Sequence, residues 1–162
     1  MGFSKKFLDT APACSVLLVR GMAGWKSVEE IVAYQLAVEL RDEIIRLTMN
    51  GPVTSDFKFR NQIRDSAASA TRNLSEVFDR YRHPEFAHLA SVAKSSLAET
   101  MTSLEDGLQR QYFTKSDTAR LLTIAERAKK TTAGLIRHLR TTPTPEAWLR
   151  IAEEKERAAH EG

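Results

Sequence analysis

The sequence has little of what disulfide-linked or membrane-spanning proteins need. Its single cysteine, Cys14, has no second cysteine with which to form a disulfide within the chain. Small secreted domains often depend on several disulfides, so this cysteine content favours a reducing, cytoplasmic setting. No stretch of the sequence approaches the roughly 20 apolar residues that a membrane helix requires, and we expect no membrane association.

Glycine and proline are also scarce, with seven and five residues among 162. Both residues interrupt helices, and the abundance of alanine, leucine, glutamate, arginine and serine favours helix over sheet. Hydrophobic residues make up 42% of the chain and charged residues 28%, which is typical of a globular protein rather than a disordered one. At this length we expect one domain with one core.

Residues 1–26 are predicted to be a variable leader outside the folded domain. Two lysines precede a mildly apolar stretch at 11–19, which is the order of features in a signal peptide. Pro12 near the start of this stretch and Arg20 at its end argue against that interpretation. We therefore expect no targeting function for this segment.

Four helices are predicted from caps, breaks and apolar spacing. The first begins at Ser27, which with Glu30 has the spacing of a capping box, and it ends at Asn50-Gly51-Pro52. The predicted ranges are 27–49, about 56–82, 84 to about 111, and 117–140. Short connections between long helices make neighbours antiparallel. The sequence therefore predicts an all-α fold, an antiparallel up-down-up-down four-helix bundle spanning residues 27–140.

Each predicted helix carries an apolar stripe at spacings of three and four residues. In the first helix the stripe comprises Ile31, Tyr34, Val38 and Ile45. In the second helix, where the period is clearest, it comprises Phe59, Ile63, Ala67, Ala70, Leu74, Val77 and Tyr81. The third helix has Phe86, Ala90, Ala93, Leu97, Thr100, Leu104 and Leu108, and the fourth has Leu121, Ile124, Ala128, Thr132, Leu135 and Leu139. These stripes are predicted to form the core.

Residues 141–162 are predicted to form a Pro/Thr linker and a short C-terminal helical tail. Pro143 and Pro145 prevent the fourth helix from continuing into the tail. The apolar residues of the tail cluster around Trp148, which we expect to dock on the bundle or on a neighbouring subunit. A frayed chain end is the alternative.

Charge is unevenly distributed, although the net charge of the chain is only +3. Residues 27–49 are net acidic, whereas residues 113–140 carry seven basic and two acidic residues. At about 100° per residue, four cations share one sector of the fourth helix opposite its apolar stripe. These are Arg120, Arg127, Lys130 and Arg137. They are predicted to bind the RNA or DNA backbone without base specificity, and a solvated face is the alternative.

No catalytic or cofactor-binding motif is evident, and we expect no enzyme activity, no cofactor and no metal. Glu85 and His88 have the i, i+3 spacing of di-metal carboxylate bundles, but such sites need two of these motifs and two further glutamates. The sequence also lacks a phosphate-binding loop of the form G-x-x-x-x-G-K-[ST].

Three polar residues of the second helix are candidates for specific contacts: Arg64, Asn73 and Glu76. Polar side chains along a helix seam can fix the register of helices or subunits through hydrogen bonds, and this is the structural role that we predict. A polar site in a central pore is the functional alternative.

The segment 62–76 resembles a known signature. Its sequence Q-I-R-D-S-A-A-S-A-T-R-N-L-S-E is similar to the Q-I-R-R-A-A-x-S-I-x-x-N-I-A-E signature of the four-helix-bundle protein family, also called the 23S ribosomal RNA intervening-sequence protein family. The pairs Tyr34-Gln35 and Glu85-Phe86 and the stretch 96–99 resemble further elements of that family. Among the departures from the signature, Asp65 stands in place of its second Arg, and Val77 stands where Gly usually follows.

The resemblance implies an all-α bundle that assembles into rings, so we expect a homo-oligomer, most simply a pentamer. A related group, the accessory variability determinants of diversity-generating retroelements, has a similar ringed bundle and binds nucleic acid and a reverse transcriptase. The resemblance thus implies a non-enzymatic oligomeric scaffold that binds RNA or DNA, with a reverse transcriptase as a further partner. The alternatives are a protein-interaction scaffold with no nucleic-acid role and an enzyme of unknown type.

Overall fold

The computed structural model describes residues 27–78 and 83–141, together with six residues between 150 and 158. Within the two long segments, the side chains of 77–78 and 83–86 are not described. The stretch Ser27–Thr142 forms one compact unit. Its elements are a 3₁₀ turn η2 (Val28–Glu30), α2 (Val32–Leu47), a second 3₁₀ turn η3 (Pro52–Ser55), α3 (Phe57–Phe78), α4 (His83–Gln109) and α5 (Lys115–Thr141).

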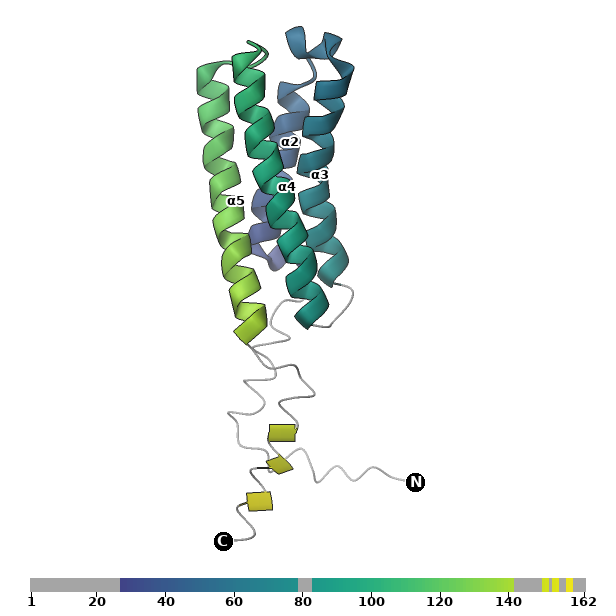
Figure 1. Cartoon of the computed structure of the whole chain (residues 1–162), viewed down its shortest axis with the longest axis vertical. Helices are drawn as coiled ribbons and strands as arrows, with labels where there is room; N and C mark the ends of the chain where they lie inside the picture. Colours follow the sequence, from purple (N-terminus) through teal and green to yellow (C-terminus); the bar gives the residue numbers. More distant parts are fainter. Residues whose placement is uncertain (1–26, 79–82, 142–149, 152, 155–156, 159–162) are drawn as a thin grey trace. The chain divides into compact units, whose positions relative to one another are not determined.

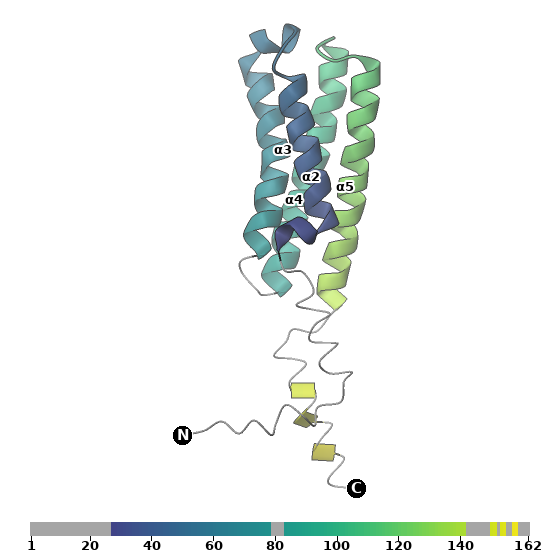
Figure 2. The same cartoon turned by 180° about the vertical axis from the view of Figure 1, so that it is seen from behind.

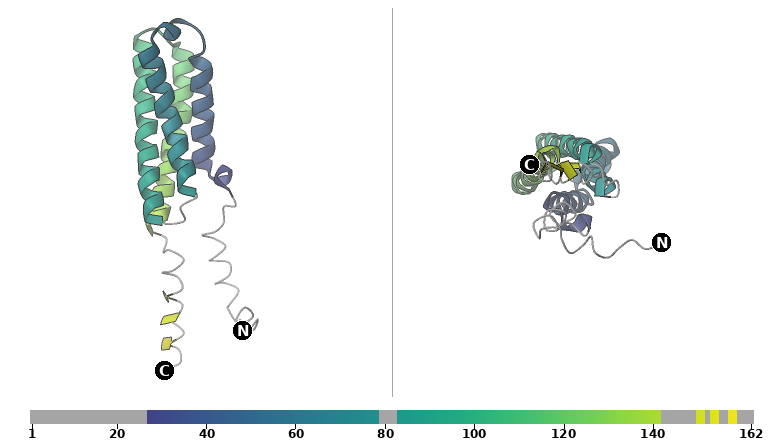
Figure 3. Two further views of the ribbon diagram at one scale, coloured as in Figure 1. Left: turned by 90° about the vertical axis from the view of Figure 1, so that its right-hand side faces the viewer. Right: turned by 90° about the horizontal axis from the view of Figure 1, so that it is seen from below.

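The four long helices form an antiparallel bundle, as the sequence predicts. Each helix packs on the next one in the chain, and α5 closes the bundle by packing on α2. The α2–α3 and α4–α5 connections lie at the same end in the front and rear views (Figures 1 and 2). We call this end, residues 48–56 and 110–114, the loop end, and the opposite end, where α5 finishes at Thr141, the terminal end. The helix axes run side by side along the bundle in the side view (Figure 3).

The first helix begins differently from its prediction. Ser27 forms no side-chain cap hydrogen bond, and the residues after it form the η2 turn. Ile31, in an extended conformation with φ −81° and ψ 112°, separates this turn from α2. The predicted capping box was therefore wrong, because the chain makes a 3₁₀ turn and an extended residue before the α-helix starts.

The buried face of α2 also differs from the predicted stripe. It consists of Ala33, Leu36, Ala37, Leu40 and Ile44. Ile31 from the predicted stripe is buried, but Ile45 is exposed. The prediction missed Leu36, Leu40 and Ile44 as well as the two alanines, because α2 carries two sets of apolar residues at helical spacing and the prediction followed the set that is only partly buried.

The other three apolar stripes lie in the core as predicted. All six predicted positions of α5 are buried. Buried stripe residues of α3 and α4 are Phe59, Ile63, Ala67, Ala70, Leu74, Ala90, Ala93, Leu97, Thr100 and Leu104, while Leu108 is half-buried. Val77, Tyr81 and Phe86 lie outside the described side chains.

The C-terminal end of α4 is a Schellman motif. Gln111 adopts a left-handed φ of 61°. Its N–H donates to the carbonyl of Leu108 at 3.0 Å, and the N–H of Tyr112 donates to the carbonyl of Gly107 at 2.8 Å. Glycine usually occupies the left-handed position of this motif. Because this position is occupied by glutamine, no local pattern marks the end of the helix, and α4 stops at Gln109 rather than near Gln111.

The leader 1–26 and the linker with Trp148 lie outside the described residues, so their predictions stay predictions. Beyond the bundle, the described residues are Arg150, Ile151, Glu153, Glu154, Arg157 and Ala158, and all six are helical. Among the described helices, none is both long and apolar enough to cross a bilayer.

Candidate functional site

The first turn of α5 is fixed by a cap. The hydroxyl of Thr114 accepts a hydrogen bond from the N–H of Asp117 at 3.1 Å and donates one to the Asp117 carboxylate at 2.6 Å. A threonine followed three residues later by an acid has capping-box spacing. The sequence therefore contained the signal for this start, although the prediction placed the connection as far as Ser116.

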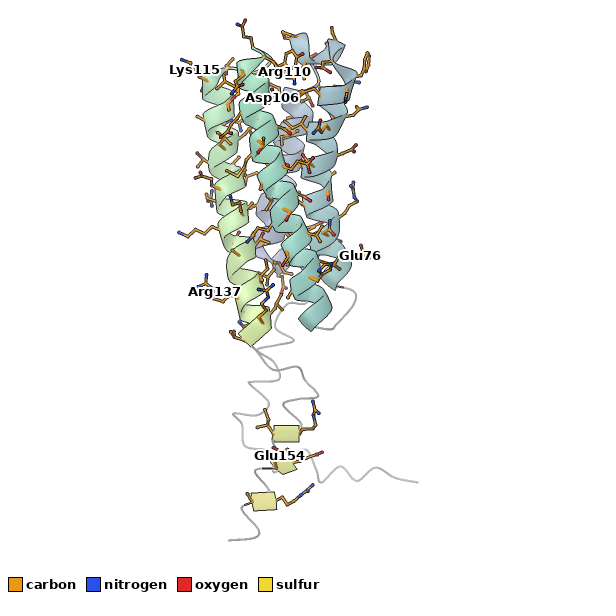
Figure 4. All side chains as sticks on the ribbon, in the orientation of Figure 1. Glu76, Asp106, Arg110, Lys115, Arg137 and Glu154 are labelled. Carbon is orange, nitrogen blue, oxygen red and sulfur yellow. The ribbon has the colours of Figure 1, made fainter. Side chains whose placement is uncertain are left out.

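The four predicted contact residues of α5 are all exposed, but they are not equivalent. Arg120 forms an ion pair with Glu43 of α2, with its Nη1 2.6 Å from Oε2. Within the described part of the chain, no carboxylate pairs with Arg127, Lys130 or Arg137. Figure 4 shows Arg137 projecting from α5 away from the bundle. We call these three residues the basic stripe, which spans about 15 Å along the helix.

Gly134 lies on the same face as the basic stripe, between Lys130 and Arg137 in sequence. It is exposed, and a Cβ added there would meet nothing within 4 Å. Its φ is not in the positive range that favours glycine. A glycine inside a helix costs about 1 kcal/mol relative to alanine, and nothing in the fold requires one here. Its effect is to leave the backbone of α5 uncovered between cations.

Arg137 also lines a surface groove of about 380 Å³ between α4 and α5 near the terminal end. The lining residues are Lys94, Ala133, Ile136, Arg137, Arg140 and Thr141. All three ionisable side chains in this lining are cations. Sequence reasoning missed the groove because Lys94 belongs to another helix, and only the packing of α4 on α5 places it beside the two arginines.

Arg64 closes the C-terminal end of α2. Its Nε donates to the Thr48 hydroxyl at 2.7 Å, and its Nη2 donates to the Thr48 carbonyl at 3.0 Å. Thr48 is fully buried, and its hydroxyl donates to the carbonyl of Ile44 at 2.7 Å. The last carbonyls of a helix lack partners within the helix and carry partial negative charge. Arg64 supplies both a donor and a positive charge, and it ties α3 to α2.

Asn73 belongs to a chain of small polar side chains between α3 and α4. Its Nδ2 donates to the Ser69 carbonyl at 2.8 Å. The Ser69 hydroxyl lies 2.9 Å from the hydroxyl of Ser96 on α4. One turn along, the Thr100 hydroxyl lies 2.9 Å from the Ser66 hydroxyl. These pairs let two helices rich in alanine and serine approach closely while their buried hydroxyls stay hydrogen-bonded.

Glu76 is exposed on α3, towards the terminal end (Figure 4). It lies twelve residues after Arg64, which corresponds to about 18 Å along the helix. The structure therefore does not bring Arg64, Asn73 and Glu76 together into one polar site.

Polar residues at the loop end contact one another. Asp56 caps α3, with Oδ1 accepting from the N–H of Phe59 at 3.0 Å and Oδ2 accepting from the Tyr112 hydroxyl at 3.0 Å. Arg110 lies 3.6 Å from the same carboxylate. The Phe59 N–H, and next the Tyr112 hydroxyl, lower the pKa of Asp56 below its ordinary value. These contacts fasten the α4–α5 connection to the start of α3.

The described residues offer no metal site. No group of three or more His, Cys, Asp and Glu side chains converges among them. His88 of the Glu85–His88 pair is exposed, and the Glu85 side chain lies outside the described part.

Comparison with known proteins identifies a family whose model matches the chain and a solved structure with a similar fold. The family model described as 23S rRNA-intervening sequence protein matches residues 29–134. A solved structure of a protein of unknown function from the S23 ribosomal protein family of Bacteroides thetaiotaomicron is similar, with a TM-score of 0.61 and 19% identity. The match covers 65% of this chain and 96% of that one, and at this identity it establishes a shared fold. No curated protein is similar enough in sequence to count as a relative.

Proposed function

The chain belongs to the 23S rRNA-intervening sequence protein family, and from this premise we propose that it is a non-enzymatic scaffold that binds nucleic acid. Binding takes place through the outward face of α5, along the sugar–phosphate backbone and without base specificity. The family name associates these proteins with a ribosomal RNA insertion, which supports RNA as the first ligand to test.

The observation that carries this proposal is the basic stripe. Arg127, Lys130 and Arg137 are exposed, and no described carboxylate pairs with them. Unpaired cations on one helix face repel one another, and no ion pair within the described part of the fold accounts for their position. When each of them neutralises a phosphate, condensed counterions are released from the nucleic acid, and this release favours binding.

Sequence-independent binding follows from the composition of this face. α5 contains no Phe, Tyr or Trp on which a base could stack. Arginine and lysine in a row along a helix contact phosphates, whereas base readout needs side chains that enter a groove in a fixed orientation. The basic stripe is therefore suited to binding the charge and shape of the nucleic-acid backbone rather than particular bases.

The proposal includes assembly into a homo-oligomer, with a pentamer expected, in the cytoplasm. Repetition of the stripe around a ring would multiply the number of phosphates contacted at once. The exposed apolar side chains of Met49 at 61% and Phe57 at 64%, which lie at or next to the loop end, support a partner surface there. A reverse transcriptase is a further partner to test.

A triple variant tests the stripe. Changing Arg127, Lys130 and Arg137 to Gln should weaken binding to RNA and DNA of any sequence and make the salt dependence less steep. Three lost phosphate contacts on a single strand correspond to a change of about 2 in the slope of log K against log salt. Fluorescence polarisation with labelled oligonucleotides at several salt concentrations measures both quantities.

The matched control removes the same charge elsewhere. Arg46, Lys58 and Arg72 are exposed cations of α2 and α3, and their change to Gln lowers the net charge equally. The control should keep most of the affinity. Equal losses in both variants would mean that only net charge matters, and unchanged affinity in the stripe variant would reject the stripe as the binding surface.

The second candidate function is a protein-interaction scaffold without a nucleic-acid role. The exposure of Met49 and Phe57 favours it, because large apolar side chains that remain in solvent often mark partner surfaces. No measurable binding of either RNA or DNA at low salt would select this candidate.

A further inference from the structure

The groove between α4 and α5 collects positive charge from two helices. Lys94 comes from α4, while Arg137 and Arg140 come from α5. All three side chains are exposed, and among the described residues none of them forms an ion pair. Three unpaired cations around one concavity provide a local field that attracts anions.

The helix dipole explains only part of this charge. Arg137 and Arg140 lie near the C-terminal end of α5, where cations offset the partial negative charge of the last carbonyls. Lys94 lies in the first half of α4, which runs from His83 to Gln109. Its charge is therefore far from the C-terminus of its own helix, and the dipole of α4 gives no reason for it.

The rest of the lining suits the non-ionic part of a nucleotide. Ala133 and the mostly buried Ile136 provide apolar surface. The Thr141 hydroxyl is already engaged, because it lies within hydrogen-bond distance of the carbonyls of Arg137 and His138, at 3.0 and 3.2 Å. Recognition of an anion is therefore left to the lysine and the two arginines, whose guanidinium groups can bind phosphate in a bidentate manner.

We propose that this groove binds a phosphate monoester, namely the terminal phosphate of a nucleic-acid strand whose backbone follows the basic stripe. The inference rests on the proposed function, and it adds the direction in which the nucleic-acid strand lies along α5. A monoester carries nearly two negative charges near neutral pH, because its second pKa is about 6. An internal diester carries one, so three cations favour the strand end over the strand interior.

The position of Arg137 connects the two surfaces. It belongs to the basic stripe and also lines the groove. A strand that runs along Arg127 and Lys130 towards the terminal end reaches the groove at Arg137. The volume of about 380 Å³ falls within the range of small-molecule sites, roughly 300–1,000 Å³, so one terminal nucleotide can enter.

The test compares oligonucleotides of one sequence that end in a 5′-phosphate, a 3′-phosphate or hydroxyls only. Wild-type protein should bind one phosphorylated form at least about tenfold more tightly than the hydroxyl form, as expected for charge-assisted contacts. Lys94→Gln with Arg140→Gln should abolish this preference and leave binding of the hydroxyl form nearly unchanged. Arg127→Gln with Lys130→Gln should weaken all three forms equally and keep the preference.

The outcomes separate the groove from the proposed function. Equal affinity of wild-type protein for all three forms would contradict phosphate binding in the groove and would leave the proposed backbone binding intact. If no oligonucleotide binds, the proposed function fails. Titration with adenosine 5′-monophosphate then tests whether the groove binds a phosphate monoester. Binding of this nucleotide that Lys94→Gln with Arg140→Gln removes would support a site for free phosphate monoesters, and absence of binding would overturn the groove as well. Thermal melts of each variant verify that the bundle is folded.

Discussion

At the loop end, charged and aromatic side chains contact one another, whereas on the outward face of α5 the cations of the basic stripe face solvent. Tyr112 packs edge-on against Phe59, with ring centroids 5.3 Å apart, and donates its hydroxyl to Asp56. Arg110 lies over the ring of Phe59 at 5.4 Å and pairs with Asp106. Nearly every polar group named at this end has a partner in the same chain.

The difference indicates what each region does. Polar groups that are satisfied within the chain stabilise the fold, and their loss leaves partners unpaired. Cations without internal partners contribute little or nothing to stability, so their clustering is explained better by an external anion. Variants of the loop end should therefore change stability, and variants of the α5 face should change binding.

The largest expected effect is the loss of an aromatic side chain at the loop end. Phe59 is 6% exposed, whereas Phe57, two residues earlier in the same helix, is 64% exposed. Phe59→Ala should lower the free energy of unfolding by about 3–5 kcal/mol, while Phe57→Ala should change it by less than about 0.5 kcal/mol. Guanidinium unfolding followed by circular dichroism measures both. A comparable loss for Phe57→Ala would show that this side chain is covered in solution by a partner.

A smaller decrease in the free energy of unfolding is expected when the C-terminal end of α2 loses its hydrogen-bond donor, Arg64. Arg64→Ala removes the guanidinium donor to the carbonyl and hydroxyl oxygens of Thr48, although the hydroxyl still donates to Ile44, and this loss should cost about 1.5–3 kcal/mol. Arg72→Ala is the matched control, because Arg72 is an exposed arginine of the same helix, and it should be near neutral. The same unfolding experiment applies, and equal effects of the two substitutions would contradict the role of Arg64 as a cap.

The bundle itself could be predicted, because helical periodicity is a local property of sequence. The predicted faces of α3, α4 and α5 are correct for this reason. The predicted face of α2 was wrong, because this helix carries a second apolar set, Leu36, Leu40 and Ile44, at the same helical spacing, and periodicity alone does not tell which set is buried. The partners of Arg64 and Arg120 lie on other helices, so no local pattern contains them. Lys94 enters the groove by the same kind of long-range packing.

The pH dependence of stability should report the Asp56 contacts. The folded-state pKa of Asp56 is lowered, so its contribution is present above the ordinary value of 3.8 and is lost as the pH falls through the folded value. The difference in melting temperature between wild type and Asp56→Asn should therefore be largest near neutral pH and shrink in acid.

Tyr112→Phe provides the control for this dependence. Removing the hydroxyl that donates to Asp56 should raise the pKa of the carboxyl group and move the loss of stability to higher pH. A difference between wild type and Asp56→Asn that stays constant from neutral to strongly acidic pH would show that the charge of Asp56 does not stabilise the fold.

The smallest expected change has the opposite sign and concerns the α5 face. Gly134→Ala and Gly134→Leu should each raise the free energy of unfolding by about 0.5–1 kcal/mol, because both residues favour helix over glycine and a Cβ meets nothing within 4 Å. If a nucleic-acid backbone approaches α5 between Lys130 and Arg137, the leucine should also weaken binding while the fold becomes more stable. Thr102→Leu, at an exposed position of α4, is the control outside α5 and should leave binding unchanged. A stabilised Gly134→Leu protein with wild-type affinity would mean that the uncovered backbone at Gly134 is not part of the interface.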